Sequence, residues 1–192
     1  MGRVGSDFLV ASLLGNKKLV FGVVVLLVLA FVFSSYVLPA LIVLVLGVAA
    51  SFSTSYKRFI RVPPAVELVT FTTVIVSIKY GPVVGAVYAA VVTLAAEIMT
   101  NALDVFIISF VPSRVAIALI SGFVFSQFDG NIMLAGLACS VIYNLLAQPF
   151  YLFMADVEMR VKSVFFVFVN VGSNFVIFAV LGRIAVRLLG IA

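Results

Sequence analysis

Residues 19–53 read LVFGVVVLLVLAFVFSSYVLPALIVLVLGVAASFS, a stretch without a single charged side chain. A bilayer core about 30 Å thick is crossed by roughly 17–25 apolar residues in a helix. One helix over the whole stretch would be roughly 50 Å long at about 1.5 Å per residue, which is more than a crossing needs. We therefore expect two spans, Leu19–Phe33 and Val37–Ser53, with a tight hairpin at Ser34-Ser35-Tyr36.

The composition extends this interpretation to the whole chain. Of the 192 residues, 65% are apolar and 10% are charged, against roughly 45–50% and about 25% in an average soluble domain. The chain has no His and a single Cys, Cys139. These counts exclude Ser-His-Asp and Cys-His catalysis, His metal sites and a CxxC redox motif. They indicate a polytopic membrane protein.

Five further apolar stretches complete a set of seven candidate spans: Pro64–Ile78, Pro82–Met99, one within Val105–Phe128, Asn131–Met154 and Ser163–Leu189. Proline is tolerated at the first helical position, because its missing N–H would have no partner there. Pro63-Pro64 and Gly81-Pro82 therefore predict the starts of two spans.

Pro112 falls inside an apolar run, and we expect the helix to begin there, with Val105–Val111 as an interfacial loop. That start places Arg114 near the membrane surface, where a charge costs less than at the bilayer centre. Asp156–Lys162 is expected to be a polar loop.

The predicted fold is all-α, a polytopic transmembrane helix bundle of six to seven spans. Residues 1–18 form a cytoplasmic or interfacial segment and residues 19–192 a single transmembrane domain of a multi-pass cell-membrane protein.

The net charge of +5 is interpreted as a topology signal rather than as a nucleic-acid surface, because the 12 Lys and Arg residues are scattered between apolar runs. Cytoplasmic loops of membrane proteins carry the excess of Lys and Arg. With seven spans, one side holds Arg3, Lys17, Lys18, Lys57, Arg58, Arg61, Arg160 and Lys162, and the other holds Lys79, Arg183 and Arg187. This count favours a cytoplasmic N-terminus and an external C-terminus.

Ionisable residues within spans are costly, so each is a candidate site. Glu67 precedes Thr70 and Ser77 in a polar stripe, and Glu97 shares a small-residue helix face with Thr93. Arg114 either pairs with Glu97 at a helix end or binds an anionic group of a small ligand. Asp104, between them, is expected to be a solvated turn residue.

Amides recur at helical spacing on the last two spans. Ser140, Asn144 and Gln148 follow one another at i, i+4 and i+8, and Asn170 and Asn174 lie at i, i+4. They either line one polar pocket or hold the helices together by hydrogen bonds. The candidate ligand-binding residues are Glu97, Arg114, Asn144, Gln148, Asn170 and Asn174.

The stretch from Pro63 to Phe125 resembles the substrate-binding S components of energy-coupling factor (ECF) vitamin transporters. The motifs that carry the resemblance are Gly81-Pro82-x-x-Gly85, the small-residue face after it, a loop at Thr100–Val111 and Leu119-Ile120-Ser121-Gly122. The resemblance implies a subunit that captures a small vitamin-like solute. It also implies two kinds of partner, a coupling membrane subunit, docked through an alanine motif best matched by Gly47-Val48-Ala49-Ala50, and ABC-type ATPases.

The family topology places the C-terminus inside, against the charge count. The near alternative is a structural membrane scaffold similar to the bacterial shape-determining protein MreD, in which the amides are only interhelical contacts. A membrane enzyme using Glu67 and Glu97 is a weaker alternative, because neither a nucleophile nor a metal-ligand set accompanies them. We therefore expect no enzyme activity and no cofactor, and the chain lacks the G-x-x-x-x-G-K-[ST] loop of an ATPase.

Overall fold

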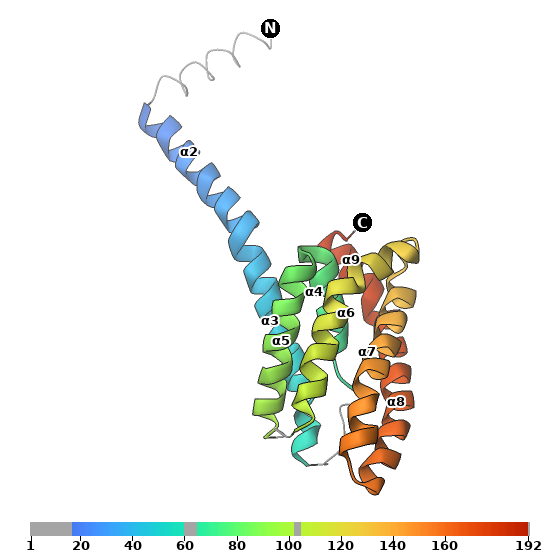
Figure 1. Ribbon diagram of the computed structural model, residues 1–192. Helices are drawn as coiled ribbons and strands as arrows, with labels where there is room; N and C mark the ends of the chain where they lie inside the picture. The colour runs from blue at the N-terminus through green and yellow to red at the C-terminus, as the bar shows by residue number, and fades with distance from the viewer. Residues whose placement is uncertain (1–16, 60–64, 102–104, 192) are drawn as a thin grey trace. The chain divides into compact units, whose positions relative to one another are not determined.

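The computed structural model describes residues 17–59, 65–101 and 105–191 of the chain (Figure 1). These residues are folded into helices joined by short connections and include no strand. Five of the helices are long and apolar enough to cross a membrane, and Val69–Tyr80 is a shorter apolar helix. The predicted all-α helical bundle is confirmed, and the apolar helices identify a membrane protein.

The chain divides into two compact units, residues 1–44 and 45–192. In the first, helix α2 (Lys17–Val32) leads through a π-helical turn, η1 (Phe33–Val37), into α3 (Leu38–Ser53). Helix α2 carries no charge after Lys18 and has no buried residue. Its surface is therefore apolar all round, as expected of a helix in contact with lipid.

The expected hairpin at Ser34-Ser35-Tyr36 is wrong, because helical structure continues from Lys17 to Ser53. The Ser34 hydroxyl donates to the carbonyl oxygen of Phe31 (3.1 Å), so this polar side chain is satisfied without leaving the helix. The wider π turn ends two residues before Pro39, whose nitrogen cannot donate to the preceding turn. The two candidate spans are one 37-residue helix.

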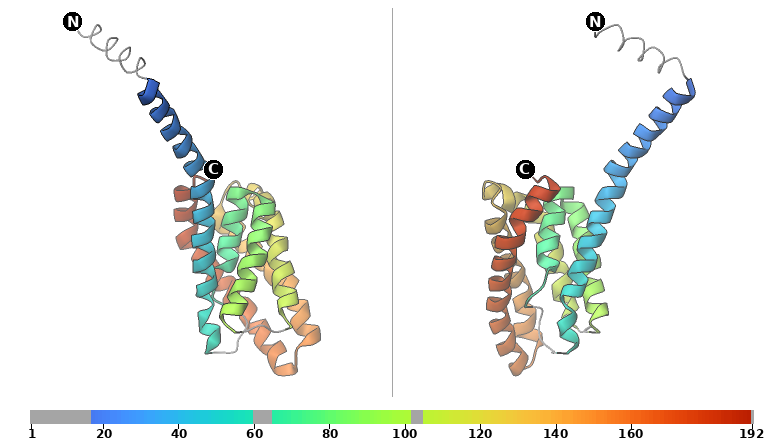
Figure 2. Two further views of the ribbon diagram at one scale, coloured as in Figure 1. Left: turned by 90° about the vertical axis from the view of Figure 1, so that its left-hand side faces the viewer. Right: turned by 180° about the vertical axis from the view of Figure 1, so that it is seen from behind.

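The second unit is a bundle of antiparallel helices connected in chain order (Figures 1 and 2). Its elements after the end of α3 are the 3-10 turn η2 (Ser55–Arg58), α4 (Val69–Tyr80), α5 (Pro82–Met99), α6 (Ile107–Gln127), α7 (Ile132–Met154), α8 (Val157–Ile177), the π turn η3 (Phe178–Gly182) and α9 (Arg183–Leu189). From α8 to α9 the chain runs as one continuous helix of 33 residues.

Helix α4 is the centre of this bundle. All residues from Val69 to Ser77 are buried, and α4 packs against α5, α6, α7 and α8. Its 12 residues extend only about 18 Å. The helix starts at Val69, not at the predicted Pro64, and Pro63-Pro64 lies outside the described residues. The segment Ala65–Leu68 before it is not helical, and this segment supplies part of the polar interior.

The start of α6 also differs from the prediction. The helix begins at Ile107, so Pro112 lies inside it. The extra turn is held by Phe106, whose carbonyl oxygen accepts hydrogen bonds from the Ser109 and Phe110 N–H groups at 2.9 and 3.2 Å. Arg114 is therefore two turns into the helix, buried in the bundle rather than near the surface. The expected interfacial loop is wrong.

The predicted polar loop Asp156–Lys162 is the first part of α8. Asp156 caps the helix, because its carboxylate accepts a hydrogen bond from the Met159 N–H at 2.8 Å. The exposed Glu158 and Lys162 form an ion pair one turn apart (2.5 Å), as expected for opposite charges at i, i+4. The last helix thus starts at Val157 rather than at Ser163.

Two glycines allow close helix approaches. A Cβ atom at Gly85 would overlap the backbone of Ser77, 2.7 Å from its Cα atom, so the Gly81-x-x-x-Gly85 pattern does mark the tight packing of α4 and α5. A Cβ atom at Gly136 of α7 would collide with the ring of Phe178. That ring is fully buried and lies edge-on to Phe71 at 5.1 Å between ring centroids.

The single helix over Lys17–Ser53 changes the charge count. Counted as one crossing, it reduces seven spans to six. The side of the N-terminus then holds six basic residues (Arg3, Lys17, Lys18, Lys79, Arg183 and Arg187) and the other holds five (Lys57, Arg58, Arg61, Arg160 and Lys162). Six against five favours neither orientation, so the bias predicted from seven spans disappears. Arg3, Arg61 and Asp104 lie outside the described residues.

We predict that Gly136→Ala destabilises the protein, because the added methyl group overlaps the buried Phe178 ring. Overpacking of this kind costs about 1–3 kcal/mol. The control is Gly172→Ala in α8, where a Cβ atom meets no atom within 4 Å. Thermal unfolding in detergent should show a lower midpoint for Gly136→Ala and an unchanged or higher one for Gly172→Ala. Equal midpoints for the two variants would contradict this packing.

Candidate functional site

Glu67 precedes helix α4 and caps it from inside the bundle. Its carboxylate accepts hydrogen bonds from the Thr70 N–H (2.9 Å) and from the Thr70 hydroxyl (2.5 Å). The residue is 1% exposed. A carboxylate at a helix N-terminus is stabilised by the free N–H groups and the helix dipole. Glu67 therefore lies before the helix, whereas the predicted start at Pro64 would place it about one turn into the span.

The second member of the site is Arg114 of α6, which is 1% exposed. Its Nη2 atom lies 3.4 Å from Oε1 of Glu67, and its guanidinium carbon lies 4.7 Å from the centroid of the Tyr143 ring. An ion pair and a cation–π contact both stabilise the positive charge away from water. The three side chains come from three different segments, and the fold brings them together.

The guanidinium is incompletely satisfied. Among the residues that the structure describes, Nε and Nη2 of Arg114 have no hydrogen-bond partner, and Nη2 contacts the Glu67 carboxylate as an ion pair at 3.4 Å. Leaving a buried donor unpaired costs about 1–3 kcal/mol, and more for a charged group. A fully buried arginine with two nitrogens that lack a hydrogen-bond partner is therefore the feature of this site that most needs an explanation.

Glu97 is the third charged residue of the interior. It lies on α5 and is 2% exposed. One interpretation of the sequence paired Arg114 with Glu97. In the structure, the carboxylate that lies 3.4 Å from Nη2 of Arg114 belongs to Glu67. Two carboxylates thus accompany one guanidinium, which gives this cluster a formal charge of −1.

The non-helical segment Ala65–Leu68 is held from the side of η2. The Tyr56 hydroxyl accepts hydrogen bonds from the N–H groups of Ala65 (3.1 Å) and Val66 (3.3 Å). The Ser53 hydroxyl accepts one from the Leu68 N–H at 2.9 Å. Burial raises the pKa of the Tyr56 hydroxyl above its usual value, although the two N–H donors lower it. Tyr56 therefore stays protonated at neutral pH and fixes the segment that carries Glu67.

A second polar cluster joins α7 to α8 through Asn170. Its Oδ1 atom accepts hydrogen bonds from Nδ2 of Asn144 (2.8 Å) and of Asn174 (3.2 Å) and from the Ser140 hydroxyl (3.4 Å). Its Nδ2 atom donates to the carbonyl oxygen of Ala65 at 3.1 Å. The predicted convergence of the two amide stripes is present, and much of their hydrogen-bonding capacity is used between the helices.

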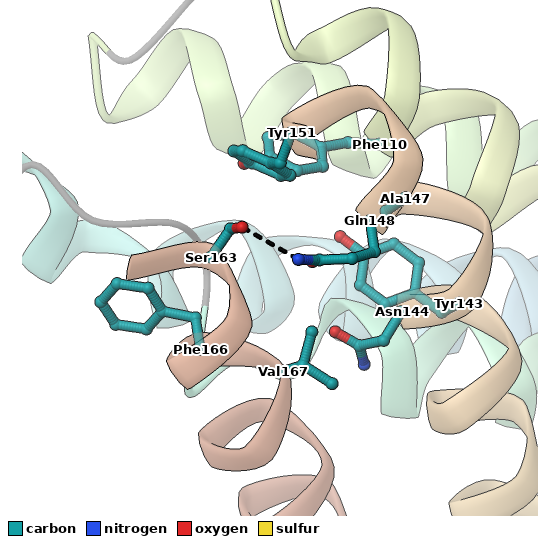
Figure 3. A pocket seen from close by; sticks show the side chains of 9 residues that line it. All are labelled: Phe110, Tyr143, Asn144, Ala147, Gln148, Tyr151, Ser163, Phe166 and Val167. Carbon is teal, nitrogen blue, oxygen red and sulfur yellow. Dashed lines mark hydrogen bonds between the residues drawn. The ribbon is translucent and has the colours of Figure 1, made fainter. Parts of the chain in front are cut away.

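Gln148 lies apart from this network, beside a small cavity between α7 and α8 (Figure 3). Its Nε2 atom donates to the Ser163 hydroxyl at 2.9 Å. The cavity has a volume of about 20 Å³ and is lined by Phe110, Tyr143, Asn144, Ala147, Gln148, Tyr151, Ser163, Phe166 and Val167. That volume holds about one water molecule.

One wall of the cavity is aromatic. The ring of Tyr151 stacks on Phe106 at 4.4 Å between centroids and lies 5.9 Å from Phe110. Tyr143 belongs both to the cavity and to the contact with Arg114. The charged cluster and the cavity therefore share a side chain, which makes them neighbouring parts of one polar interior.

The structure groups the sequence candidates in two sets. Arg114 and Glu97 belong to the charged cluster, and the amides Asn144, Gln148, Asn170 and Asn174 lie between α7 and α8. Sequence reasoning missed the role of Tyr143, although its position three residues after Ser140 places it near the amide face of the helix. It did not connect Glu67 with Arg114, because they are 47 positions apart.

Within the described residues no group of Cys, Asp and Glu side chains could hold a metal ion.

We predict that Glu67→Ala destabilises the protein by about 3–5 kcal/mol, because it leaves Arg114 as a buried charge without its partner. The matched control is Glu158→Ala, which breaks an exposed ion pair to Lys162 that should contribute only about 0.2–1 kcal/mol. Chemical denaturation in detergent measures both. Similar losses for the two variants would show that the Glu67–Arg114 pair is not buried as described.

The charged cluster and the cavity have no counterpart in a known protein that matches this chain. No protein-family model, no curated protein and no solved structure matches the chain. What the arrangement offers chemically is a buried guanidinium with free donors, two carboxylates, and a cavity lined by amides and aromatic rings.

Proposed function

We propose that the chain is the membrane-embedded, substrate-binding subunit of an ECF-type uptake transporter in the cell membrane. The observation that carries the proposal is the buried Arg114, whose Nε and Nη2 atoms have no hydrogen-bond partner within the described residues. Ionisable groups inside membrane bundles mark substrate or ion pathways by default. A solute with an acceptor group would satisfy both nitrogens in the planar geometry that guanidinium groups favour.

The lining of the cavity indicates the kind of solute. Asn144 and Gln148 present amide groups, and Phe110 and Tyr151 present aromatic rings. Flat rings stack on such side chains, and amides form hydrogen bonds with ring nitrogens and carbonyl oxygens. A small, flat, vitamin-like molecule with both donors and acceptors fits this chemistry.

Binding requires the cavity to widen, since about 20 Å³ has room for one water and not for a solute. The hydrogen bond between Gln148 and Ser163, which both line the cavity, joins α7 to α8 at this point (Figure 3). A solute would replace this bond with its own hydrogen bonds to Gln148. The two helices would separate at the end where Ala155 and Asp156 connect them.

Transport would depend on partners, a coupling membrane subunit and ABC-type ATPases. The chain has no phosphate-binding loop of its own. In the docking motif proposed for the coupling subunit, Gly47 and Ala50 are buried, while Val48 and Ala49 are exposed. The last two side chains would be the ones available for that contact.

The test is a thermal-shift screen of the purified protein in detergent against a panel of water-soluble vitamins, with native mass spectrometry for a co-purified solute. We expect one compound to raise the unfolding midpoint, and Gln148→Ala to weaken its binding at least tenfold, because the variant removes a direct hydrogen bond. The matched control is Gln127→Ala, an exposed glutamine at the opposite end of the bundle. If no compound binds, or if Gln148→Ala binds as well as Gln127→Ala, the proposal is wrong.

The second candidate is a structural scaffold of the MreD kind. The observation that favours it is the hydrogen-bond network around Asn170, which ties α8 to α7 and to Ala65 without a ligand. In a scaffold, variants of the amides would lower stability but change no binding. The same screen separates the candidates, because only the binding subunit gains stability from a solute.

A further inference from the structure

A larger pocket lies at the other end of the second unit, between helix α9 and the connection from α6 to α7. Figure 1 shows these elements at one end of the bundle. Its volume is about 320 Å³, within the range of small-ligand pockets. It is lined by Asp129, Gly130, Asn131, Ile132, Met133, Arg183, Val186 and Arg187. None of these residues belongs to the polar interior described above.

The two arginines give the pocket its chemistry. Arg183 and Arg187 are one helical turn apart on α9, so both face the same side of the helix. Neither guanidinium has an ion pair or a side-chain hydrogen bond to any residue that the structure describes. The one carboxylate in the lining is that of Asp129. Two guanidinium groups against one carboxylate leave the pocket with a formal charge of +1.

The start of α7 adds to the positive potential. Helix α7 has 23 residues, and its N-terminal residues Ile132 and Met133 line the pocket. The Asn131 side chain already accepts the Met133 and Leu134 N–H groups at 3.2 Å, so what remains for a ligand is the positive end of the helix dipole. This dipole acts with the two arginines.

Exposed apolar side chains surround the pocket. Ile184 and Leu188, on α9 beside the arginines, are 51% and 79% exposed, and Leu134 on α7 is 38% exposed. Lys79 lies at the same end, where its Nζ atom donates to the carbonyl oxygen of Gly190 at 3.3 Å. Exposed apolar side chains next to unpaired cations fit a ligand with acyl chains and an anionic headgroup.

We propose that this pocket binds the phosphate group of an anionic phospholipid. Guanidinium groups bind phosphate oxygens in a bidentate fashion, and basic pockets between transmembrane helices are suited to acidic headgroups. The acyl chains would lie along the exposed side chains of α7 and α9. This proposal is independent of solute binding in the polar interior, because the two sites share no residue.

The experiment is native mass spectrometry of the full chain released from nanodiscs that contain equal amounts of phosphatidylglycerol and phosphatidylcholine. We expect phosphatidylglycerol to be retained preferentially. Arg183→Gln and Arg187→Gln should each weaken its retention about fivefold, and the double variant about 25-fold. Circular dichroism of each variant verifies that it is folded, which we expect because both side chains are exposed.

The matched control is the double variant Arg160→Gln/Lys162→Gln, which removes the same charge from the opposite end of the bundle, where both side chains are also exposed. It should retain phosphatidylglycerol as the unmodified chain does. Equal retention of the two lipids, or an equal effect of the two double variants, would overturn the proposal. A titration with glycerol 1-phosphate forms a separate arm: tight binding of this soluble ester without a lipid preference would assign the pocket to a soluble phosphate and also overturn the lipid proposal.

Discussion

The interior of this bundle is organised by the need to neutralise Arg114. A guanidinium that is 1% exposed has lost its water, and an isolated charge in such surroundings costs several kcal/mol. The nearest compensation is Glu67 at 3.4 Å, which lies not on a spanning helix but on the short segment before α4. The position of that segment therefore decides whether the charge is tolerated.

The segment Ala65–Leu68 is held by Tyr56 on one side and by α8 on the other. The contact with α8 links the segment to the amides. Tyr56 accepts hydrogen bonds from its N–H groups, while Asn170 and Ser173 of α8 donate to the carbonyl oxygen of Ala65 at 3.1 and 2.8 Å. Ala65 is two residues from Glu67. The amide network and the ion pair are thus linked through the short backbone stretch from Ala65 to Glu67, although they involve different helices. A change between α7 and α8 has a physical route to the charged cluster through Ala65.

The sequence predicted those helix boundaries that are set by residues adjacent to them. Helix α5 covers Pro82–Met99 as expected, because Gly81, with φ of 95°, ends one helix and Pro82 begins the next. Helix α7 begins after Asn131, which caps it. In both cases the residues that set the boundary are adjacent to it.

The predictions that failed relied on local breakers inside long apolar runs. Ser34 and Pro112 disfavour a helix in isolation, yet the chain continues as helix through both, because a backbone N–H or C=O left unpaired in lipid costs more than a π turn or one missing hydrogen bond. The contact between Glu67 and Arg114 depends on the packing of α4 against α6. A single sequence carries no periodicity that reports such a long-range contact.

The balance of charge in the interior limits what the site can accept. Arg114 has two nitrogens without a hydrogen-bond partner within the described residues, but the carboxylate of Glu67 lies 3.4 Å from it, and Glu97 is a second buried carboxylate of the bundle. A purely anionic solute would gain from the arginine and be repelled by the carboxylates. A solute that offers donors as well as an acceptor can satisfy Arg114 and the carboxylates together, and the amide of Gln148 can pair with either kind of group. An amphoteric ring is therefore favoured over a simple anion.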